Sequence, residues 1–422
     1  MGGSIAGVAK RAPASEVDFA LIGHQESWRA AADVLAVLRG PGRTPLPDDE
    51  IQDILPWIPP RAVCHVDIVS VTGAKARGLY IDSFIPPGRL EAANVHENIA
   101  RVRAAAACAI NAGAKIVSLG GFSSILIEGN FDLLPNKNDL LSKNLDLHST
   151  KFDQLPKKLD RLPEKNETVF TTGNTLTVGF IVQGIQKMCA RESRNLSKST
   201  LLVVGATGDV GSGCARCLAP AVRRVLLSAR NPDRLRRLAA ELQADGIQVE
   251  IATDLQRFSV EADVVICAAS LPSPSLLLDR VAPHAIVCDA GYPKNLSPSA
   301  KMLGAKIFFG GLGQITGGMR FAPDFHGILN RHPFPDVVHG CLLEGMALAL
   351  EGRFESFSQG RGFISRGRVE EMLAIAARHG IYLAPLYNAD GPIEDETSSP
   401  DGMDLSMSAG PTMGVGRFPS CP

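Results

Sequence analysis

Three glycines, Gly205, Gly208 and Gly211, stand between an apolar run and a helical pattern. The apolar residues 201–204 predict a short buried strand, and apolar residues at three- and four-residue steps after Gly211 predict a helix. At this spacing, glycines let the backbone turn tightly against a pyrophosphate, whose charge the amide groups at the helix start stabilise. A second strand is predicted at 224–228, as a βαβ unit requires. The stretch predicts a dinucleotide-binding unit; the alternative is a glycine-rich turn in an ordinary α/β domain.

The end of the second strand predicts which dinucleotide binds. An acidic residue there would hold a ribose 2′-hydroxyl, but the first carboxylate after the strand is Asp233. Ser228 can donate a hydrogen bond and Arg230 can pair with a 2′-phosphate, so NADP is favoured over NAD. Alternatively, Arg230 is a solvated residue at the start of the next helix. The predicted cofactor-binding residues are Gly205, Thr207, Gly208, Asp209, Val210, Gly211, Ser228, Arg230 and Ala269.

Length, charge and cysteine usage narrow the class of protein. The 422 residues suffice for two or three domains, and 45% hydrophobic residues suffice for buried cores. A net charge of -1 lacks the basic excess that a nucleic-acid partner would need. No apolar run is long enough for a membrane span and no signal peptide is visible, so we expect a cytoplasmic protein with at most transient contact with a membrane surface. The nine cysteines show no disulfide pattern, and Cys214 and Cys217, inside a predicted helix, predict no metal site.

Alternating strand and helix patterns predict an α/β protein with a central doubly wound Rossmann domain. An N-terminal α/β domain is expected to bind substrate, and a helical segment is expected after the Rossmann domain. Residues 130–168 have little periodicity, which is typical of a lid, a binding loop or disorder. The predicted boundaries are 1–16 for a flexible tail, 17–196 for the N-terminal domain, 197–312 for the Rossmann domain, 313–388 for the C-terminal helical segment and 389–422 for a disordered tail.

Individual elements follow from the same patterns. Residues 63–71 and 76–84 alternate around a glycine-bearing turn, so they predict a hairpin. A helix is predicted at 176–191, and its candidate N-terminal caps are Thr171, Thr172 and Asn174. Further strands of the doubly wound sheet are predicted at 248–251, 262–269, 285–289 and 306–309, and later helices at 337–350 and 368–379.

A loop of small residues, 120–124, follows a strand predicted at 115–119. In open α/β sheets, ligands bind at the carboxyl ends of the strands. The loop is therefore expected either to face a ligand or to be a plain connection to the next helix. The residues expected to face a substrate are Gly121, Ser123, Ser124, Thr172 and Asn174.

Seven motifs, in order along the chain, resemble a known family. They are Leu21 to His24, Val69 to Gly73, Ala114 to Ser124, Phe170 to Thr175, Gly205 to Gly211, Asp289 to Asn295 and Glu351 to Arg353. Together they resemble the long-chain fatty acyl-ACP reductases best known from cyanobacteria, over about 19–383. The resemblance implies the NADPH-dependent reduction of a fatty acyl thioester, on acyl carrier protein or coenzyme A, to a fatty aldehyde. It also implies the three-part organisation given above.

The sequence departs from the family at its reaction centre. The family's nucleophilic cysteine lies four residues before the aspartate of its Asp-Gly-Gly-Tyr-Pro-Lys-Asn motif, and Ala285 occupies that place here. Cys288 is next to the aspartate instead, and residues 285 and 288 of a strand point to opposite faces unless a bulge re-aims one of them. Leu176 occupies the place of the family's histidine after Gly-Asn. Gln314 and Ile315 occupy the place of the family's glutamate-histidine pair. The binding frame is expected to persist while the reaction centre is altered.

Reduction of a thioester needs a hydride aimed at the carbonyl carbon and a group that holds the developing charge on oxygen. A cysteine intermediate would divide the reaction into acyl transfer and hydride delivery. Cys288 is the first candidate nucleophile and Cys267 the second; the alternative is that both are small buried hydrophobic residues. Without an acyl-enzyme, Lys294 or Tyr292 would donate the proton, unless their turn only shapes the loop.

Three functions remain open at this point. The first is an NADP-dependent acyl-thioester reductase, and the second is a reductase of a ketone or aldehyde that needs no acyl-enzyme, which the missing cysteine favours. The third is a nucleotide-binding sensor or partner subunit without catalysis. His24 and His339 are interpreted as packed or surface residues rather than as acids or bases.

Overall fold

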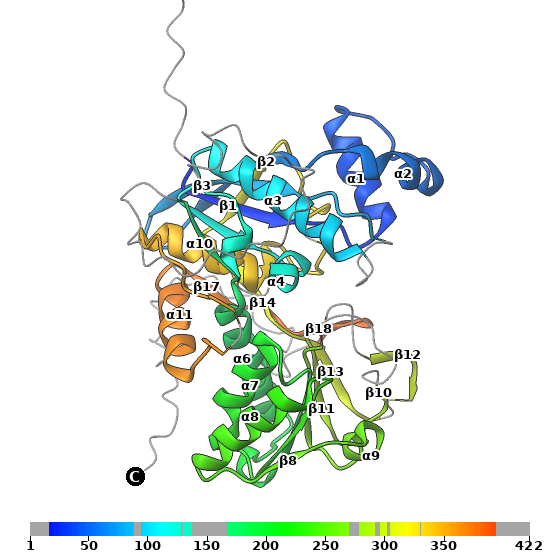
Figure 1. Cartoon of the computed structure of the whole chain (residues 1–422), viewed down its shortest axis with the longest axis vertical. Coiled ribbons are helices and arrows are strands. Elements are labelled where there is room, and N and C mark those ends of the chain that lie inside the picture. Colours follow the sequence, from blue (N-terminus) through cyan, green and yellow to red (C-terminus); the bar gives the residue numbers. More distant parts are fainter. Residues whose placement is uncertain are drawn as a thin grey trace, which may run out of the picture.

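The computed structural model describes residues 17–87, 94–127, 130–136, 168–269, 278–291, 296–301, 304–329, 331–360 and 362–393. Figure 1 shows two lobes, each built on a six-stranded sheet. The chain fills the upper lobe first, passes into the lower lobe, and then returns to the junction and the upper lobe. No helix among the described residues has the length and apolar character needed to cross a membrane.

The lower lobe has the predicted doubly wound sheet. Its six parallel strands lie in the order β13-β11-β9-β6-β7-β8, which is the Rossmann order 6-5-4-1-2-3 in chain sequence. Both faces of the central strands β6, β9 and β11 are buried, which explains their continuous apolar runs, whereas the edge strand β8 is partly exposed. The strands are β6 (Thr200–Val204), β7 (Arg224–Ser228), β8 (Val249–Ile251), β9 (Val264–Cys267), β11 (Ile286–Asp289) and β13 (Lys306–Phe309).

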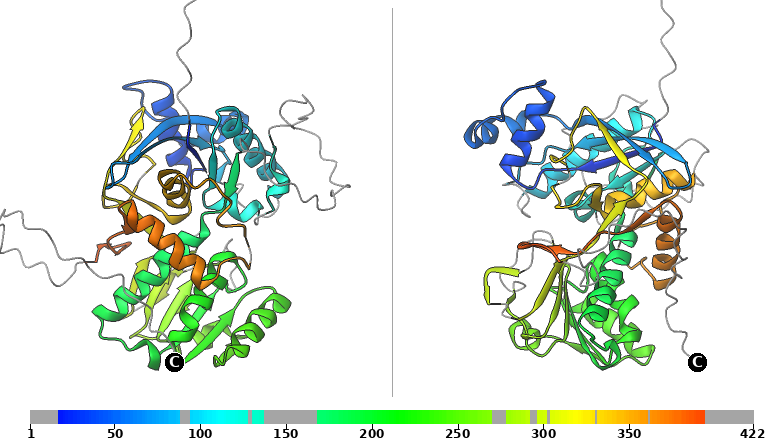
Figure 2. Two further views of the ribbon diagram at one scale, coloured as in Figure 1. Left: turned by 90° about the vertical axis from the view of Figure 1, so that its left-hand side faces the viewer. Right: turned by 180° about the vertical axis from the view of Figure 1, so that it is seen from behind.

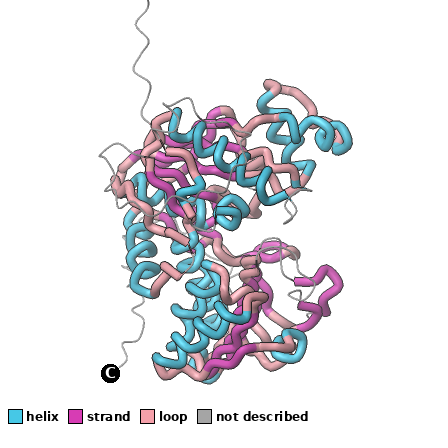
Figure 3. Tube along the Cα trace, viewed as in Figure 1, coloured by secondary structure: helices cyan, strands magenta, loops and turns pink. Residues whose placement is uncertain are grey.

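Helices cover this sheet. Figure 3 shows the lower-lobe helices gathered against the strands, with α6 (Asn174–Arg191) and α7 on one face. Asn231 caps α8 by accepting a hydrogen bond from the backbone N–H of Arg234, and Asp254 caps α9 in the same way. The bounds are α7 (Asp209–Leu218), α8 (Pro232–Ala244) and α9 (Leu255–Ser259), beside the paired strands β10 (Leu278–Arg280) and β12 (Leu296–Lys301).

The upper-lobe sheet is mixed, in the order β15-β2-β3-β1-β4-β5. The predicted hairpin is confirmed, because β2 and β3 pair in antiparallel fashion, whereas β1, β3, β4 and β5 are parallel. The strands are β1 (Phe19–Gly23), β2 (Arg61–Val69), β3 (Lys75–Asp82), β4 (Ile116–Leu119), β5 (Val169–Thr171) and β15 (Met319–Ala322). The helices are α1 (Trp28–Leu38), α2 (Asp48–Ile54), α3 (Val95–Asn111) and α4 (Phe122–Ile127).

The segment expected to be helical, 313–388, also supplies strands. Its β15 extends the upper sheet beside β2, and β14 pairs with β16 and β17 in a small sheet at the junction. These strands have four residues or fewer, which is too short for an alternating pattern to stand out. The bounds are β14 (Leu312–Ile315), β16 (Val337–His339), α10 (Gly340–Glu351), α11 (Arg366–Arg378), β17 (Ile381–Leu383), β18 (Tyr387–Asn388) and β19 (Gly391–Pro392).

Helix α6 (Asn174–Arg191) joins the two lobes. It packs against α7, α10 and α11, and Figure 2 shows α11 crossing the junction beside it. The predicted helix is confirmed, but none of its three predicted caps is used. The cap position is Gly173, with φ of +70°, because a side chain there would collide with the backbone of Cys341. Short 3-10 turns lie at Leu55–Trp57, Phe131–Leu133, Leu196–Lys198 and Ala219–Ala221.

Candidate active site

The glycine turn between β6 and α7 has the geometry that its spacing predicts. Gly205 has φ of +81°, and a Cβ there would lie 2.6 Å from the backbone nitrogen of Ala269. A Cβ on Gly211 would collide with the carbonyl oxygen of Gly205. Gly208 is different, since its φ is -74° and a Cβ would lie 3.3 Å from that oxygen. Gly205 and Gly211 are therefore required by the protein's own packing, whereas Gly208 leaves space in front of the turn.

The residues around the turn fit a dinucleotide. Gly208 is the N-terminal cap position of α7 and has no side chain to cap the first turn, as a phosphate site needs. Strand order reverses between β7 and β9 on either side of β6, which is where ligands bind in such sheets. Ser228 is buried at the end of β7, and its backbone carbonyl accepts hydrogen bonds from the N–H groups of Gly205 and Ala206. Arg230, two residues later, is exposed.

Two loops of the upper lobe meet this turn. Asn174 donates a hydrogen bond of 2.9 Å from Nδ2 to Oδ2 of Asp209, which ties the start of α6 to the start of α7. The backbone N–H of Gly121 lies 3.5 Å from Sγ of Cys341, beside Gly173. The structure therefore brings the predicted substrate loops and the predicted cofactor turn together.

The hydroxyl groups of Ser123 and Thr172 are buried in these loops. Within the described part of the chain, neither Oγ of Ser123 nor Oγ1 of Thr172 has a hydrogen-bond partner. A buried hydroxyl without a partner is unfavourable by about 1–3 kcal/mol, so both groups suit a role as donors to a bound ligand. Ser124 differs, because its hydroxyl donates to the carbonyl of Gly121 at 2.8 Å and shapes the loop.

A buried carboxylate, Glu344 of α10, holds the start of α6. It accepts hydrogen bonds from Oγ1 of Thr171 at 2.5 Å, from the backbone N–H of Leu176 at 3.1 Å and from Oγ of Ser358 at 2.9 Å. Burial raises the pKa of Glu344, and these hydrogen bonds oppose the shift. Sequence reasoning missed this residue, although a lone acidic side chain within an apolar helix was the signal for it.

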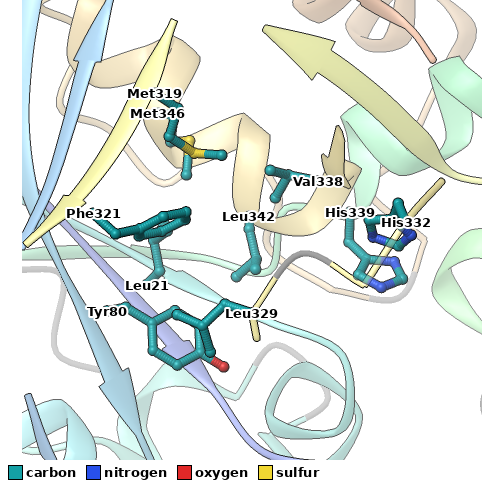
Figure 4. Close-up of a pocket in the computed structure, with 10 residues that line it drawn as sticks. All are labelled: Leu21, Tyr80, Met319, Phe321, Leu329, His332, Val338, His339, Leu342 and Met346. Carbon is teal, nitrogen blue, oxygen red and sulfur yellow. The ribbon is translucent and has the colours of Figure 1, made fainter. Parts of the chain in front are cut away.

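An apolar pocket lies between the upper sheet and α10 (Figure 4). The space between these side chains is about 330 Å³ when the solvent at its open mouth is included, so the enclosed part is much smaller. Figure 4 shows His332 and His339 together at one end, with their ring centroids 5.4 Å apart, and apolar side chains at the other end. The lining residues are Leu21, Tyr80, Met319, Phe321, Leu329, His332, Val338, His339, Leu342 and Met346.

The candidate cysteines lie in apolar cores. Cys288 has no exposed surface and packs on the α6 side of the sheet, against Gly310 and with Ile181 in the same core. Ala285 belongs to the core on the opposite face, as the strand pattern predicts, and Cys267 lies on that face too. Tyr292 and Lys294 lie outside the described residues.

His24 of the Leu-Ile-Gly-His motif is buried beside the 120–124 loop. Its ring packs edge to face on Phe122 with centroids 5.9 Å apart, and a Cβ on Gly121 would touch it. Burial lowers the pKa of His24 to about 4, with an opposing contribution from Glu26. The interpretation of His24 as a packed residue agrees with this environment.

We expect His24→Leu to reduce the loss of stability in mild acid. The unfolded chain binds a proton at His24 near pH 6.5 but the folded chain only near pH 4, so stability is full above pH 6.5 and is lost as the pH falls toward 4. Between pH 7.5 and pH 5 this group alone removes about 2 kcal/mol. Burial raises the pKa of Asp82 to about 6, and this group stabilises the folded chain as the pH falls. Because Asp82 is present in both proteins, the contribution of His24 is the difference between wild type and variant in urea unfolding at pH 7.5 and pH 5. An equal pH response in the two proteins would contradict the assignment.

Several known proteins are similar to this chain. The shikimate / quinate 5-dehydrogenase family matches residues 187–308, from within α6 to the penultimate residue of β13. The long-chain acyl-[acyl-carrier-protein] reductase of Synechococcus elongatus is 30% identical over 376 residues, which are 86% of this chain and 97% of that protein. Glutamyl-tRNA reductase of Thermomicrobium roseum is 30% identical over 137 residues, 31% of each chain. The solved glutamyl-tRNA reductase of Methanopyrus kandleri is 20% identical, covers 50% of this chain and 46% of its own, and has a TM-score of 0.25.

Proposed function

Because the chain belongs to the family of long-chain acyl-[acyl-carrier-protein] reductases, we propose that it reduces fatty acyl thioesters, carried by acyl carrier protein or coenzyme A, to fatty aldehydes. It is an NADP-dependent oxidoreductase with a Rossmann sheet. The observation that carries the choice of substrate is the 30% identity to the long-chain acyl-[acyl-carrier-protein] reductase of Synechococcus elongatus over 86% of this chain, and the apolar side chains against α10 support it.

Residues of the lower lobe hold the dinucleotide in this proposal. The turn from 205 to 211, including Thr207 and Val210, cradles the pyrophosphate, and Ser228 and Arg230 bind the 2′-phosphate. Ala269 packs beside Gly205 at the end of β9 and limits the nicotinamide side of the crevice. When bound, NADPH supplies a hydride to a carbonyl carbon.

Residues of the upper lobe hold the acyl group. Each methylene buried against apolar side chains contributes about 0.8 kcal/mol, so the apolar residues of the pocket favour an aliphatic substrate over a polar one. The buried hydroxyls of Ser123 and Thr172 are placed to donate hydrogen bonds to the polar end of the substrate or its carrier arm. Asn174, through Asp209, keeps these loops in register with the cofactor turn.

A second function, the reduction of a ketone or aldehyde without an acyl-enzyme, is favoured by one observation. Ala285 stands where the family has its nucleophile, and Cys288 is enclosed in an apolar core. A cysteine enclosed in an apolar core usually serves as a packing residue rather than as a nucleophile. The chemistry would then need hydride transfer alone.

One assay separates the two functions. The purified full chain is mixed with NADPH and with matched thioesters, ketones and aldehydes of equal chain length, and the loss of NADPH absorbance is followed together with the products. Aldehyde formed from a thioester supports the first function, and turnover confined to ketones or aldehydes supports the second. Trapping of a labelled acyl group, repeated with Cys288→Ala, tests the covalent route; label that survives the substitution excludes Cys288.

We expect Arg230→Ala to weaken NADPH binding about tenfold and to leave NADH binding unchanged. Arg230 lies just after β7 and is exposed, so its loss removes one charge-assisted hydrogen bond to the 2′-phosphate without disturbing a core. Fluorescence titration with NADPH and with NADH measures the two dissociation constants in wild type and variant. Arg236→Ala, on the exposed face of α8, is the control. Equal weakening of both nucleotides would place Arg230 outside the 2′-phosphate site.

A further inference from the structure

The side chain of Asn174 contacts helix α7 rather than its own helix. Asn174 is the first residue of α6, where an asparagine often caps the helix, but α6 has no side-chain cap. Instead, Nδ2 of Asn174 donates a hydrogen bond of 2.9 Å to Oδ2 of Asp209, the first residue of α7. A residue that gives up a local role for a distant contact is expected at a functional site.

The segment before Asn174 is fixed to the upper lobe. Oγ1 of Thr171 donates to Glu344 at 2.5 Å, and the backbone N–H of Thr172 donates to the carbonyl of Ser358 at 3.0 Å. The hydroxyl of Thr172 is buried and, among the residues that the structure describes, has no hydrogen-bond partner. The loop proposed to hold the substrate is thus attached to the upper lobe at one end and to α7 at the other.

Asp209 belongs to the phosphate-binding turn. It follows Gly208, and the N–H of Ser212 donates to the carbonyl of Gly208 at 3.0 Å in the first hydrogen bond of α7. The amide groups of residues 209–211 precede that bond, and amide groups in this position bind a pyrophosphate. The backbone of residue 209 is therefore part of the cofactor site, whereas its side chain holds Asn174.

Charge makes this hydrogen bond depend on the cofactor. A pyrophosphate at the turn brings a second negative group close to the carboxylate of Asp209. The amide N–H of Asn174 offsets part of the repulsion, since a donor to a charged group forms a stronger hydrogen bond. The bond should therefore hold Asn174, and the loop before it, more firmly when the phosphate site is filled.

We propose that Asn174 is the positioning residue through which the dinucleotide and the acyl thioester strengthen each other's binding. The inference rests on the proposed function, which it deepens by naming how the two binding sites communicate. A thioester bound without the cofactor cannot be reduced, so this coupling favours the complex that holds both. By linkage, each ligand raises the affinity for the other by the same factor.

Binding in the presence of NADP+ measures the coupling without turnover, because the oxidised cofactor has no hydride to transfer. The full chain is titrated with palmitoyl-coenzyme A, first alone and then at saturating NADP+. We expect NADP+ to lower the dissociation constant of palmitoyl-coenzyme A about tenfold in wild type, the scale of one hydrogen bond to a charged group, and less than about twofold in Asn174→Ala.

Two further variants test the cause. Asp209→Asn keeps an acceptor oxygen without the charge, so its coupling should lie between that of wild type and that of Asn174→Ala. Asn195→Ala is the matched control, because Asn195 follows the opposite end of α6, where its side chain accepts the backbone N–H of Ser197. Its coupling should equal that of wild type.

Hydrogen exchange tests the loop itself, with no thioester present. NADP+ is expected to slow the amide exchange of residues 172–176 about tenfold in wild type and to leave it unchanged in Asn174→Ala. Helix α3 is the internal control, because it packs on the face of the upper sheet away from α10. Its exchange should not respond to NADP+ in either protein.

The proposed coupling and the proposed function fail separately. If wild type shows no coupling, if Asn174→Ala keeps the tenfold effect, or if NADP+ slows exchange of the loop equally in both proteins, the positioning role is overturned whatever the enzyme reduces. If wild type binds and reduces no thioester but NADP+ still protects the loop only when Asn174 is present, the thioester function falls and the link between loop and cofactor turn stands.

Discussion

Gly205→Ala should weaken NADPH binding at least 100-fold. The backbone at residue 205 is in the left-handed region, with φ of +81°, and the added Cβ would lie 2.6 Å from the backbone nitrogen of Ala269. The colliding atoms belong to the backbone of the turn and of the residues after β9, so neither can move without disturbing the sheet. The turn must shift, and amide groups that bind a pyrophosphate lose affinity steeply when they are displaced. Fluorescence titration of the folded variant with NADPH measures the loss.

Two further glycines separate the causes. The backbone at Gly246 has a similar φ, +79°, but a Cβ there would meet nothing within 4 Å. Gly246→Ala therefore introduces the same backbone strain as Gly205→Ala without a steric collision, and it should leave the NADPH affinity unchanged. Gly208→Ala has an ordinary φ and only a 3.3 Å contact with Gly205, so it should fold normally yet weaken NADPH binding, since its Cβ enters the space that a pyrophosphate would use. Affinity within threefold of wild type in Gly205→Ala would place the dinucleotide elsewhere.

The lower lobe was predictable because its signals are local. Parallel strands with two buried faces produce apolar runs such as 201–204 and 264–267, and the glycine turn marks the first of them. The upper hairpin was predictable for the same reason, from alternation around one turn. The return of β15 to pair with β2 was not, because it joins residues about 250 positions apart and its four residues carry no distinctive pattern.

The candidate site also contains parts that the sequence predicted and parts that it did not. The glycine turn and the loops at 121–124 and 172–174 were found from their positions after strands, and the structure brings them together. Glu344 was missed, because it belongs to no motif and its contacts with Thr171 and Leu176 span about 170 positions. Cys288 was the natural candidate by chemistry alone; only the packing shows that α6 encloses it.

Glu344→Ala should destabilise the fold by about 3–5 kcal/mol. The substitution leaves the hydroxyl of Ser358, the backbone N–H of Leu176 and the hydroxyl of Thr171 without their shared acceptor in a buried site. Each buried donor that loses its partner is unfavourable by about 1–3 kcal/mol, and an empty space replaces the carboxyl group. Since Gly173 offers α6 no side-chain cap, the first turn of α6 loses its main support. Urea unfolding and hydrogen exchange at the Leu176 amide measure the effect.

The consequence extends to the cofactor turn. Asn174 begins α6 and holds Asp209 at 2.9 Å, so loosening the first turn of α6 should weaken NADPH binding as well as stability. Glu351→Ala is the matched control, because Glu351 ends the same helix α10 but is partly exposed, and its ion pair with Arg378 and its contact with His379 lie at the edge of the fold rather than in a closed buried network. Glu344→Gln keeps one acceptor oxygen, so its loss of stability should be smaller than that of Glu344→Ala. If Glu344→Ala lost no more stability than Glu351→Ala, the carboxylate would not be what holds the two lobes in register.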